Sequence, residues 1–275
     1  MKTILDDIVA KVRLRLAEKE RLKPLVEIVR TAAAQPTPRD FAGALRGARF
    51  ALISEIKKAS PAKGWLHEEL DILKQAKMYE QGGASAVSVL TEPDYFKGSL
   101  EDLKSVRAAV KLPVLRKDFI LGRYQVYEAR LYGADAVLLI VSLLAPDTLR
   151  DLISLAHEMK MSALVEVHDE AETKTALTAG ARIIGINNRN LADFTVDLGT
   201  SLKLRPLVPP EITVISESGI ATKEDVSRLK GAGINGILVG EALVKAENPE
   251  AKIRELLGRA KESRIQNPVA SSQNL

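Results

Sequence analysis

The 275-residue sequence contains no cysteine, few aromatic residues and no long apolar run. Without cysteine, a disulfide framework, thiolate catalysis and cysteine-based zinc sites are excluded, and this usage is typical of a protein of the reducing cytoplasm. The N-terminal stretch MKTILDDIVAKVRLRLAEKE carries a charge every few residues, so we expect no signal peptide. No apolar run approaches the roughly 18 residues of a membrane helix, which predicts a soluble, cytoplasmic protein.

Aromatic residues make up only 4% of the chain, and Lys and Arg alternate with Asp and Glu although the net charge is +4. Nucleic-acid binding is disfavoured because both a basic stripe and stacking aromatics are missing. An anionic metabolite would account for the basic balance equally well. The three histidines, His67, His157 and His168, lack metal-ligand spacing, so we expect no metal site. His168 follows a predicted strand and is interpreted as a loop histidine.

The 46% hydrophobic content is that of an ordinary globular protein. Residues from about 4 to 18 predict an amphipathic helix that packs on another part of the molecule. Thr3 and Asp6 resemble a capping box at its start. Its apolar face consists of Ile4, Leu5, Ile8, Val9, Val12 and Leu16. A proline-containing stretch, AAAQPTPRD, follows as a linker or extension.

From about residue 51 onward, short apolar runs alternate with amphipathic stretches. The runs are ALISEIK, AVSVL, PVLRKD, AVLLIV, ALVEV, IIGINN, TVISES and GILVG. Eight such strand signals separated by helical patterns indicate repeated βαβ units. We therefore predict an α/β fold, a (β/α)8 TIM barrel with an N-terminal helical extension. A doubly wound open sheet is the alternative, but the glycine-rich dinucleotide fingerprint typical of it is absent.

Gly-Ala pairs recur where the predicted helices end, which favours one repeated unit over two fused domains. The four pairs begin at Gly83, Gly133, Gly180 and Gly231, and each glycine is expected to supply a left-handed helix cap. We expect a single domain over 1–275. It would comprise a helical extension and linker (1–48), the barrel (49–262) and a disordered polar tail (263–275).

Ionisable and amide side chains gather where five of the predicted strands end. They are Glu55 and Lys57, Arg116, Lys117 and Asp118, Glu166, Asn187 to Asn190, and Ser216 to Gly219. Any one group could be a structural ion pair. Because all strand ends of a barrel meet at one rim, the five together predict an active site there. Paired lysines and carboxylates suit acid–base chemistry.

Two glycines follow the last two predicted strands, Gly219 and Gly240. Glycine lets backbone N–H groups approach an anion, and this end of a barrel is the usual phosphate seat of the fold. Taken alone, both could be turn glycines. Together with the charged rim, they predict an enzyme for a phosphorylated small molecule.

Five segments at these strand ends match one known family. They are EIKKASPAKG (55–64), SVLTEPDYFKG (88–98), LRKDFI (115–120), GINNRNL (185–191) and SESGI (216–220). On these motifs the chain resembles the indole-3-glycerol-phosphate synthase family of tryptophan biosynthesis, over essentially its whole length. The resemblance implies ring closure, decarboxylation and dehydration of 1-(2-carboxyphenylamino)-1-deoxyribulose 5-phosphate, a carboxy-lyase reaction that needs no cofactor.

The resemblance also implies roles for the rim residues. Lys117 would be the general acid on the ketone oxygen, and Lys57 would hold the substrate carboxylate. Glu166 would be the general base, with Glu55 in the same network. The remaining catalytic and substrate-orienting residues would be Asn187, Ser218, Arg189 and Glu217. The phosphate would lie among Ser60, Gly219, Gly240 and the N–H of Glu241, and the anthranilate ring among Phe96, Phe119 and Leu138.

The segment from Ser60 to Gly64 is placed to be a lid over the mouth. Ala62 stands where many relatives have serine, and Glu241 is an awkward neighbour for a phosphate unless its carboxylate turns away. The partner expected is the small-molecule substrate, with no nucleic acid and no membrane, and the chain would be a monomer or a dimer. Alternatives are another phosphate-binding barrel enzyme of tryptophan biosynthesis, or a non-catalytic barrel that serves as a binding protein.

Overall fold

Eight parallel strands form a closed barrel in the computed structural model, which describes residues 3–61, 63–190 and 194–259. The strands are β1 (Ala51–Ile56), β4 (Ala86–Leu90), β5 (Val114–Lys117), β6 (Ala136–Ile140), β7 (Ser162–Val167), β8 (Ile183–Asn187), β9 (Thr213–Glu217) and β10 (Gly236–Val239). Each hydrogen-bonds to its neighbours in chain order, and β1 closes the circle against β10. The predicted (β/α)8 barrel and its strand signals are confirmed.

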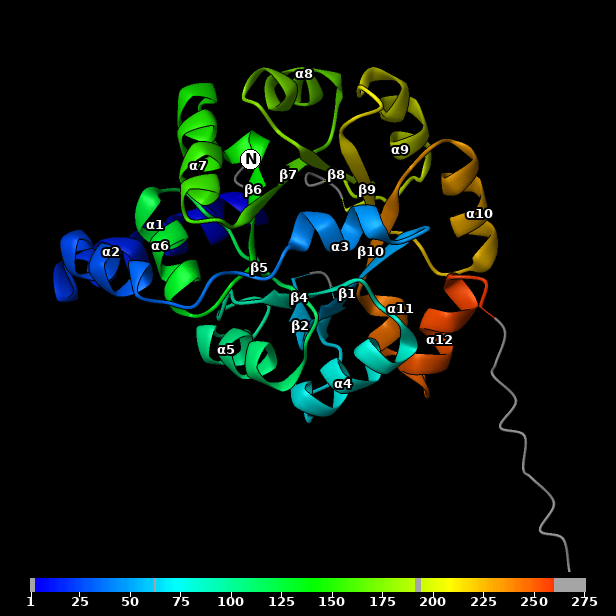
Figure 1. The fold of residues 1–275 in the computed structure, drawn as a ribbon, viewed down its shortest axis with the longest axis horizontal. Helices are drawn as coiled ribbons and strands as arrows, with labels where there is room; N and C mark the ends of the chain where they lie inside the picture. Colours follow the sequence, from blue (N-terminus) through cyan, green and yellow to red (C-terminus); the bar gives the residue numbers. More distant parts are fainter. Residues whose placement is uncertain (1–2, 62, 191–193, 260–275) are drawn as a thin grey trace, which may run out of the picture.

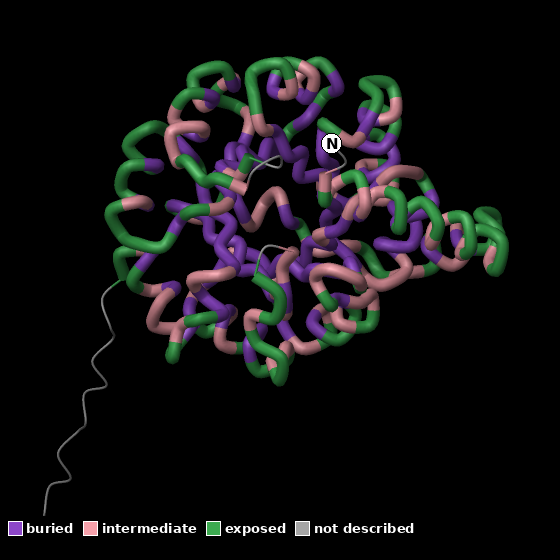
Figure 2. Tube along the Cα trace, turned by 180° about the vertical axis from the view of Figure 1, so that it is seen from behind, coloured by how far each residue is buried: buried purple, intermediate pink, exposed green. Residues whose placement is uncertain are grey.

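Helices surround the barrel, as Figure 1 shows. They are α1 (Ile4–Leu22), α2 (Leu25–Ala33), α3 (Phe41–Gly47), α4 (Ile72–Gly82), α5 (Leu100–Ala109), α6 (Arg123–Leu131), α7 (Pro146–Glu158), α8 (Glu170–Thr178), α9 (Gly199–Leu204), α10 (Lys223–Gly231), α11 (Glu241–Val244) and α12 (Pro249–Leu256), with 3-10 turns η1 (Val141–Leu143) and η2 (Arg205–Leu207). Buried residues concentrate between barrel and helices, and exposed ones lie on the outer helical faces (Figure 2). Within the described ranges, no helix is both long and apolar enough to cross a membrane.

The N-terminal extension contributes three helices rather than one helix and a linker. The predicted first helix is confirmed and extends to Leu22, with the Thr3–Asp6 capping box in place. α2 and α3 lie in the segment that separates it from the barrel. α3 crosses one end of the barrel (Figure 1), where Phe41 and Leu45 are fully buried among the apolar side chains of the barrel interior. The extension therefore closes the barrel at that end.

Three of the four predicted glycine caps are confirmed. Gly83, Gly133 and Gly180 all have φ between 85° and 88°, a left-handed conformation that glycine adopts without a Cβ penalty. The prediction for Gly231 is wrong. Gly231 is the last residue of α10, and the left-handed residue is Gly233, with φ 81°. In the sequence Gly231-Ala232-Gly233 the helix includes the first glycine, so the second glycine adopts the left-handed conformation that follows the helix.

A two-stranded antiparallel hairpin follows β1, formed by β2 (Ala59–Ser60) and β3 (Gly64–Trp65). This is the segment that the sequence analysis interprets as a lid, and its short strands were not predicted. Ala62, the departure from the family pattern, lies outside the described residues. So does the predicted tail at 263–275, and the proposed domain limits there stay a prediction.

One buried carboxylate ties the linker to the start of two strands. Asp135, 1% exposed, accepts hydrogen bonds from the backbone N–H of Arg39 at 2.6 Å and of Val114 at 2.8 Å. It also pairs with Arg107 Nε at 2.9 Å. Two backbone hydrogen bonds and one ion pair on this buried carboxylate hold the linker against the barrel, because the two N–H groups would otherwise lose their acceptor.

We predict that Asp135→Ala lowers the free energy of unfolding by about 3 kcal/mol, because it leaves buried donors and a partly buried guanidinium unpaired. The measurement is urea unfolding followed by circular dichroism. Asp151→Ala on the exposed side of α7 is the control, with an expected change within about 0.5 kcal/mol. Equal stability of the two variants would contradict the prediction.

Candidate active site

A cavity of about 590 Å³ opens at the carboxyl ends of the strands. All the site residues expected from the sequence line it: Glu55, Lys57, Ser60, Phe96, Lys117, Phe119, Leu138, Glu166, Asn187, Arg189, Glu217, Ser218, Gly219, Gly240 and Glu241. In a barrel these ends carry the chemistry, because loops from all strands converge there. The structure therefore brings the predicted set together at one place, whereas the role of each residue is a separate question.

Lys117 lies at the centre of this cavity, at the end of β5. Its Nζ is 3.4 Å from Glu217 Oε2, 3.6 Å from Glu166 Oε2 and 3.8 Å from Glu55 Oε2. Burial by itself would lower the pKa of Lys117, but the three surrounding carboxyl groups outweigh burial and raise it. Lys117 is thus an ammonium group that can donate a hydrogen bond to a bound oxygen.

Glu55 and Lys57 project from the first strand end on the same face, as the alternation of a strand requires. Lys57 Nζ is 3.0 Å from Glu55 Oε1. Burial would raise the pKa of Glu55, yet the charges of Lys57 and Lys117 lower it. Glu55 is therefore an ionised carboxylate between two ammonium groups.

The other two carboxyl groups have opposite protonation tendencies. Burial favours the neutral form of both, but Lys117, His168 and Asn187 lower the pKa of Glu166. The pKa of Glu217 is raised, first by burial and then by the neighbouring carboxylates, and Lys117 compensates only in part. Pairs whose surroundings push their pKa values apart divide acid and base roles between them. Glu217 therefore holds a proton more readily than Glu166.

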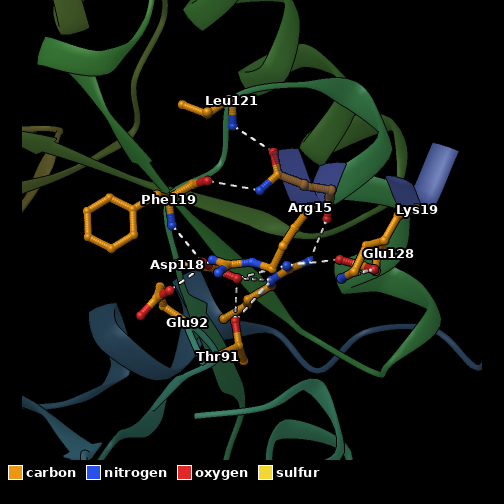
Figure 3. Close-up of polar contacts among 10 residues, drawn as sticks. Arg15, Lys19, Thr91, Glu92, Asp118, Phe119, Leu121 and Glu128 are labelled. Carbon is orange, nitrogen blue, oxygen red and sulfur yellow. Dashed lines mark hydrogen bonds and ion pairs between the residues drawn. The ribbon is translucent and has the colours of Figure 1, made fainter. Parts of the chain in front are cut away.

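A buried ionic cluster on the outer side of β5 fixes the backbone that carries Lys117. Arg116 is 2% exposed, and its Nη2 donates to Asp118 Oδ2 at 2.8 Å and to Glu128 Oε2 at 3.0 Å. Lys19 of α1 reaches the other oxygen of Glu128 at 2.6 Å. Figure 3 shows Lys19, Asp118 and Glu128 converging between α1 and the barrel wall. The neighbours of Lys117 in sequence are thus held on both sides.

α1 also joins the barrel through Arg15 (Figure 3), which pairs with the buried Glu92 at 2.8 Å and with Asp94. This docking places Ile4, Leu5 and Ile8 in the wall of the cavity. They were not predicted as site residues. The apolar face of the first helix indicated that these residues are packed, but it did not indicate which part of the molecule they contact.

The apolar part of the cavity contains Phe96 and Phe119, whose ring centroids are 6.1 Å apart at 41°. Leu138 reaches it from β6. Phe194 and Val196, from the segment after β8, line the same cavity and were not predicted. A flat aromatic substrate fits such a slot, because aromatic contacts supply large apolar area with defined geometry.

The other end of the cavity contains backbone suited to an anion. Ser218 and Gly219 both have positive φ, 67° and 78°, and Gly240 precedes α11. A Cβ on Gly240 would lie 2.5 Å from Glu55 Oε1, so any other residue would displace the Glu55 carboxylate. The carboxylate of Glu241 is bound by Lys63 at 2.5 Å and by Lys245 at 2.7 Å. Two lysines therefore neutralise the Glu241 carboxylate, so it need not repel a phosphate bound nearby.

The histidines lie elsewhere. His168 is not in the cavity wall but behind it, 3.4 Å from Glu166 through Nε2. Among the residues that the structure describes, no group of three or more histidine, aspartate or glutamate side chains is arranged to hold a metal ion.

The closed barrel, with lysines and carboxyl groups gathered at the carboxyl ends of its strands, defines the class as a (β/α)8-barrel enzyme. Among solved structures, the fold is similar to thiamine phosphate pyrophosphorylase from Pyrococcus furiosus. The TM-score is 0.60 at 20% identity, over 78% of this chain and 96% of that one. At that identity the likeness concerns the fold alone.

Sequence relatives identify the family. The family model described as indole-3-glycerol phosphate synthase matches residues 5–256. Proteins of that name from Dehalococcoides mccartyi (strain CBDB1) and Lacticaseibacillus paracasei are 53% and 47% identical. The first alignment covers 80% of this chain and 86% of the relative, and the second covers 94% and 100%. The chain belongs to the indole-3-glycerol phosphate synthase family, and it is accordingly a carboxy-lyase of tryptophan biosynthesis.

We predict that Gly240→Ala lowers kcat/KM for the family's reaction by about ten- to a hundredfold, because the added methyl group displaces the Glu55 carboxylate. Gly231→Ala is the matched control, since a Cβ there meets nothing within 4 Å, and its activity should equal that of the wild type. A fully active Gly240→Ala enzyme would show that Glu55 tolerates displacement.

Proposed function

We propose that the chain converts 1-(2-carboxyphenylamino)-1-deoxyribulose 5-phosphate into indole-3-glycerol phosphate, carbon dioxide and water. The observation that carries this proposal is the ammonium group of Lys117 among three carboxyl groups, in a chain of this family. The cavity has a cationic centre, an apolar slot and a glycine-rich end. These match the ketone and carboxylate, the aromatic ring and the phosphate of the substrate.

In the first step, the ring carbon that bears the carboxylate attacks the ketone carbon. A negative charge develops on the ketone oxygen, and Lys117 neutralises it by donating its proton. A donor placed in a buried site stabilises such a charge more than water does, because it does not have to reorganise. Lys57 lies on the same side and would hold the substrate carboxylate by charge until that group leaves.

Carbon dioxide then leaves, and the electrons of the broken carbon–carbon bond restore the aromatic ring. The remaining hydroxyl group departs as water, and a proton is lost from the carbon next to the nitrogen to form the pyrrole double bond. We assign this proton to Glu166, because its lowered pKa keeps it ionised at neutral pH and its Oε2 has no hydrogen-bond partner. Glu55 belongs to the same network and pairs with both lysines.

The substrate would lie with its anthranilate ring among Phe96, Phe119 and Leu138. Its phosphate would lie near Ser60, Gly219, Gly240 and the N–H of Glu241, with Lys63 and Lys245 within reach. Asn187, Arg189, Glu217 and Ser218 would orient the sugar chain and the carboxyl groups. Because one chain supplies all these residues, we propose that the enzyme acts as a monomer, and we propose a cytoplasmic location for it.

We predict that purified protein mixed with this substrate releases a product with indole fluorescence. The measurement is the rise of that fluorescence under steady-state conditions. Absence of product at micromolar enzyme would overturn the proposed function.

We predict that Lys117→Ala reduces kcat by about a hundredfold or more, the usual contribution of a positioned proton donor. Substrate affinity should stay within about tenfold, because the lysine acts mainly in the transition state. The measurements are single-turnover kinetics and equilibrium binding. Lys77→Ala, on the exposed side of α4, is the control. Loss of binding with high residual turnover would contradict the general-acid role.

A further inference from the structure

His168 lies directly behind the proposed base and outside the cavity wall. It is the first residue after β7 and lies two residues after Glu166. Its side chain is 14% exposed. Such a histidine was interpreted from the sequence as an ordinary loop residue.

The imidazole of His168 bridges two carboxylates. Its Nδ1 is 3.0 Å from Glu172 Oε2, and its Nε2 is in ion-pair contact with Glu166 Oε1 at 3.4 Å. Glu172 Oε2 also accepts the backbone N–H of His168 at 2.8 Å. Glu172 is itself held at the start of α8, where its N–H donates to Asp169 Oδ1 at 2.8 Å. The ring therefore has a fixed position relative to a rigid helix.

The two oxygens of Glu166 have different surroundings as a result. Oε1 faces His168 and accepts a hydrogen bond from Asn187 Nδ2 at 3.1 Å. Oε2 is buried, has no hydrogen-bond partner and lies 3.6 Å from Lys117. Oε1 is thus the anchored oxygen, and Oε2 is the one that can receive a proton from the substrate.

We propose that His168 is a positioning residue, a charged imidazolium that holds Glu166 with Oε1 anchored and Oε2 turned toward the cavity. The assignment rests on the proposed function in one respect, the role of Glu166 as the base. His168 does not touch the substrate. It acts through the orientation and the ionisation of the carboxylate in front of it.

The charges around the pair support this role. Burial would lower the pKa of His168, but Glu166 and Glu172 raise it to about 10. The ring is therefore charged at neutral pH and loses its charge only as the pH rises through that value. Glu166 faces Lys117 from β5 and Asn187 from β8 as well as His168, and its carboxylate neighbours are Glu55 and Glu217. Since His168 is one of two cations that lower the pKa of Glu166, removing its charge raises that pKa.

The kinetic test uses His168→Gln, which keeps an amide N–H donor but has no charge. We expect kcat to fall about tenfold, part of the ~10²–10⁴ that a general base contributes, with KM within about threefold. The acid limb of the kcat–pH profile should move to higher pH by about one unit, because the less stabilised Glu166 is protonated sooner. Unchanged kcat, or a lower kcat with an unmoved acid limb, would overturn the proposal.

The matched control is His157→Gln. His157 lies at the end of α7, next to the start of β7, and is therefore at the opposite end of that strand from Glu166. This variant should keep the wild-type kcat and pH profile. If the wild type itself fails to turn over the substrate, the proposed function is wrong, and that outcome is distinct from an active wild type with an equally active His168→Gln.

A second measurement does not depend on activity. The ¹⁵N spectrum of the imidazole groups separates neutral from doubly protonated rings, and the chain has only three histidines, so His168→Gln assigns the signal by its loss. We expect His168 to be doubly protonated at pH 8, where an ordinary histidine is neutral. Glu172→Gln should lower the pKa of His168, because it removes one of the two carboxylates beside the ring. A neutral His168 at pH 8 would falsify the proposal.

Discussion

The position of one ammonium group determines much of this active site. Lys117 Nζ is within 4 Å of carboxyl groups from three other strands, and each of these groups depends on it. Three carboxylates could not share a buried space of this size without a cation, because like charges at short distance favour protonation. The lysine in turn remains charged in a buried site because the carboxyl groups surround it. The barrel makes this mutual dependence possible, since its strands deliver side chains from all directions to one point.

Much of the fold and the proposed site could be predicted from the sequence, because both follow from local patterns. Strand runs such as Ala136–Ile140 are apolar throughout, and the charges that follow a run, such as Lys117, must lie at the rim of a closed barrel. Shorter elements could not be predicted. α11 has four residues and α9 six, too few for a helical period to show.

Contacts between distant segments were the other part that the sequence could not supply. The apolar face of the first helix was recognisable, but its place in the cavity wall depends on ion pairs across large separations, such as Lys19 with Glu128. Glu241 was judged by its neighbours in sequence, whereas Lys63, far away in the chain, neutralises it. His168 was likewise judged by its position in a loop. Its two carboxylate neighbours are close in sequence, but only the folded backbone turns them toward one ring.

Three consecutive residues at the end of β5 serve two different purposes, one structural and one catalytic. Arg116 and Asp118 bind each other, and Arg116 also pairs with Glu128 of α6, whereas Lys117 lies among the carboxyl groups of the cavity. Selection for a folded protein therefore acts on the outer pair, and selection for turnover acts on the residue between them. In a variant library scored separately for cellular abundance and for growth without tryptophan, these adjacent codons should fall into different classes. The variants at one strand end would then distinguish the positions needed for folding from the position needed for the reaction.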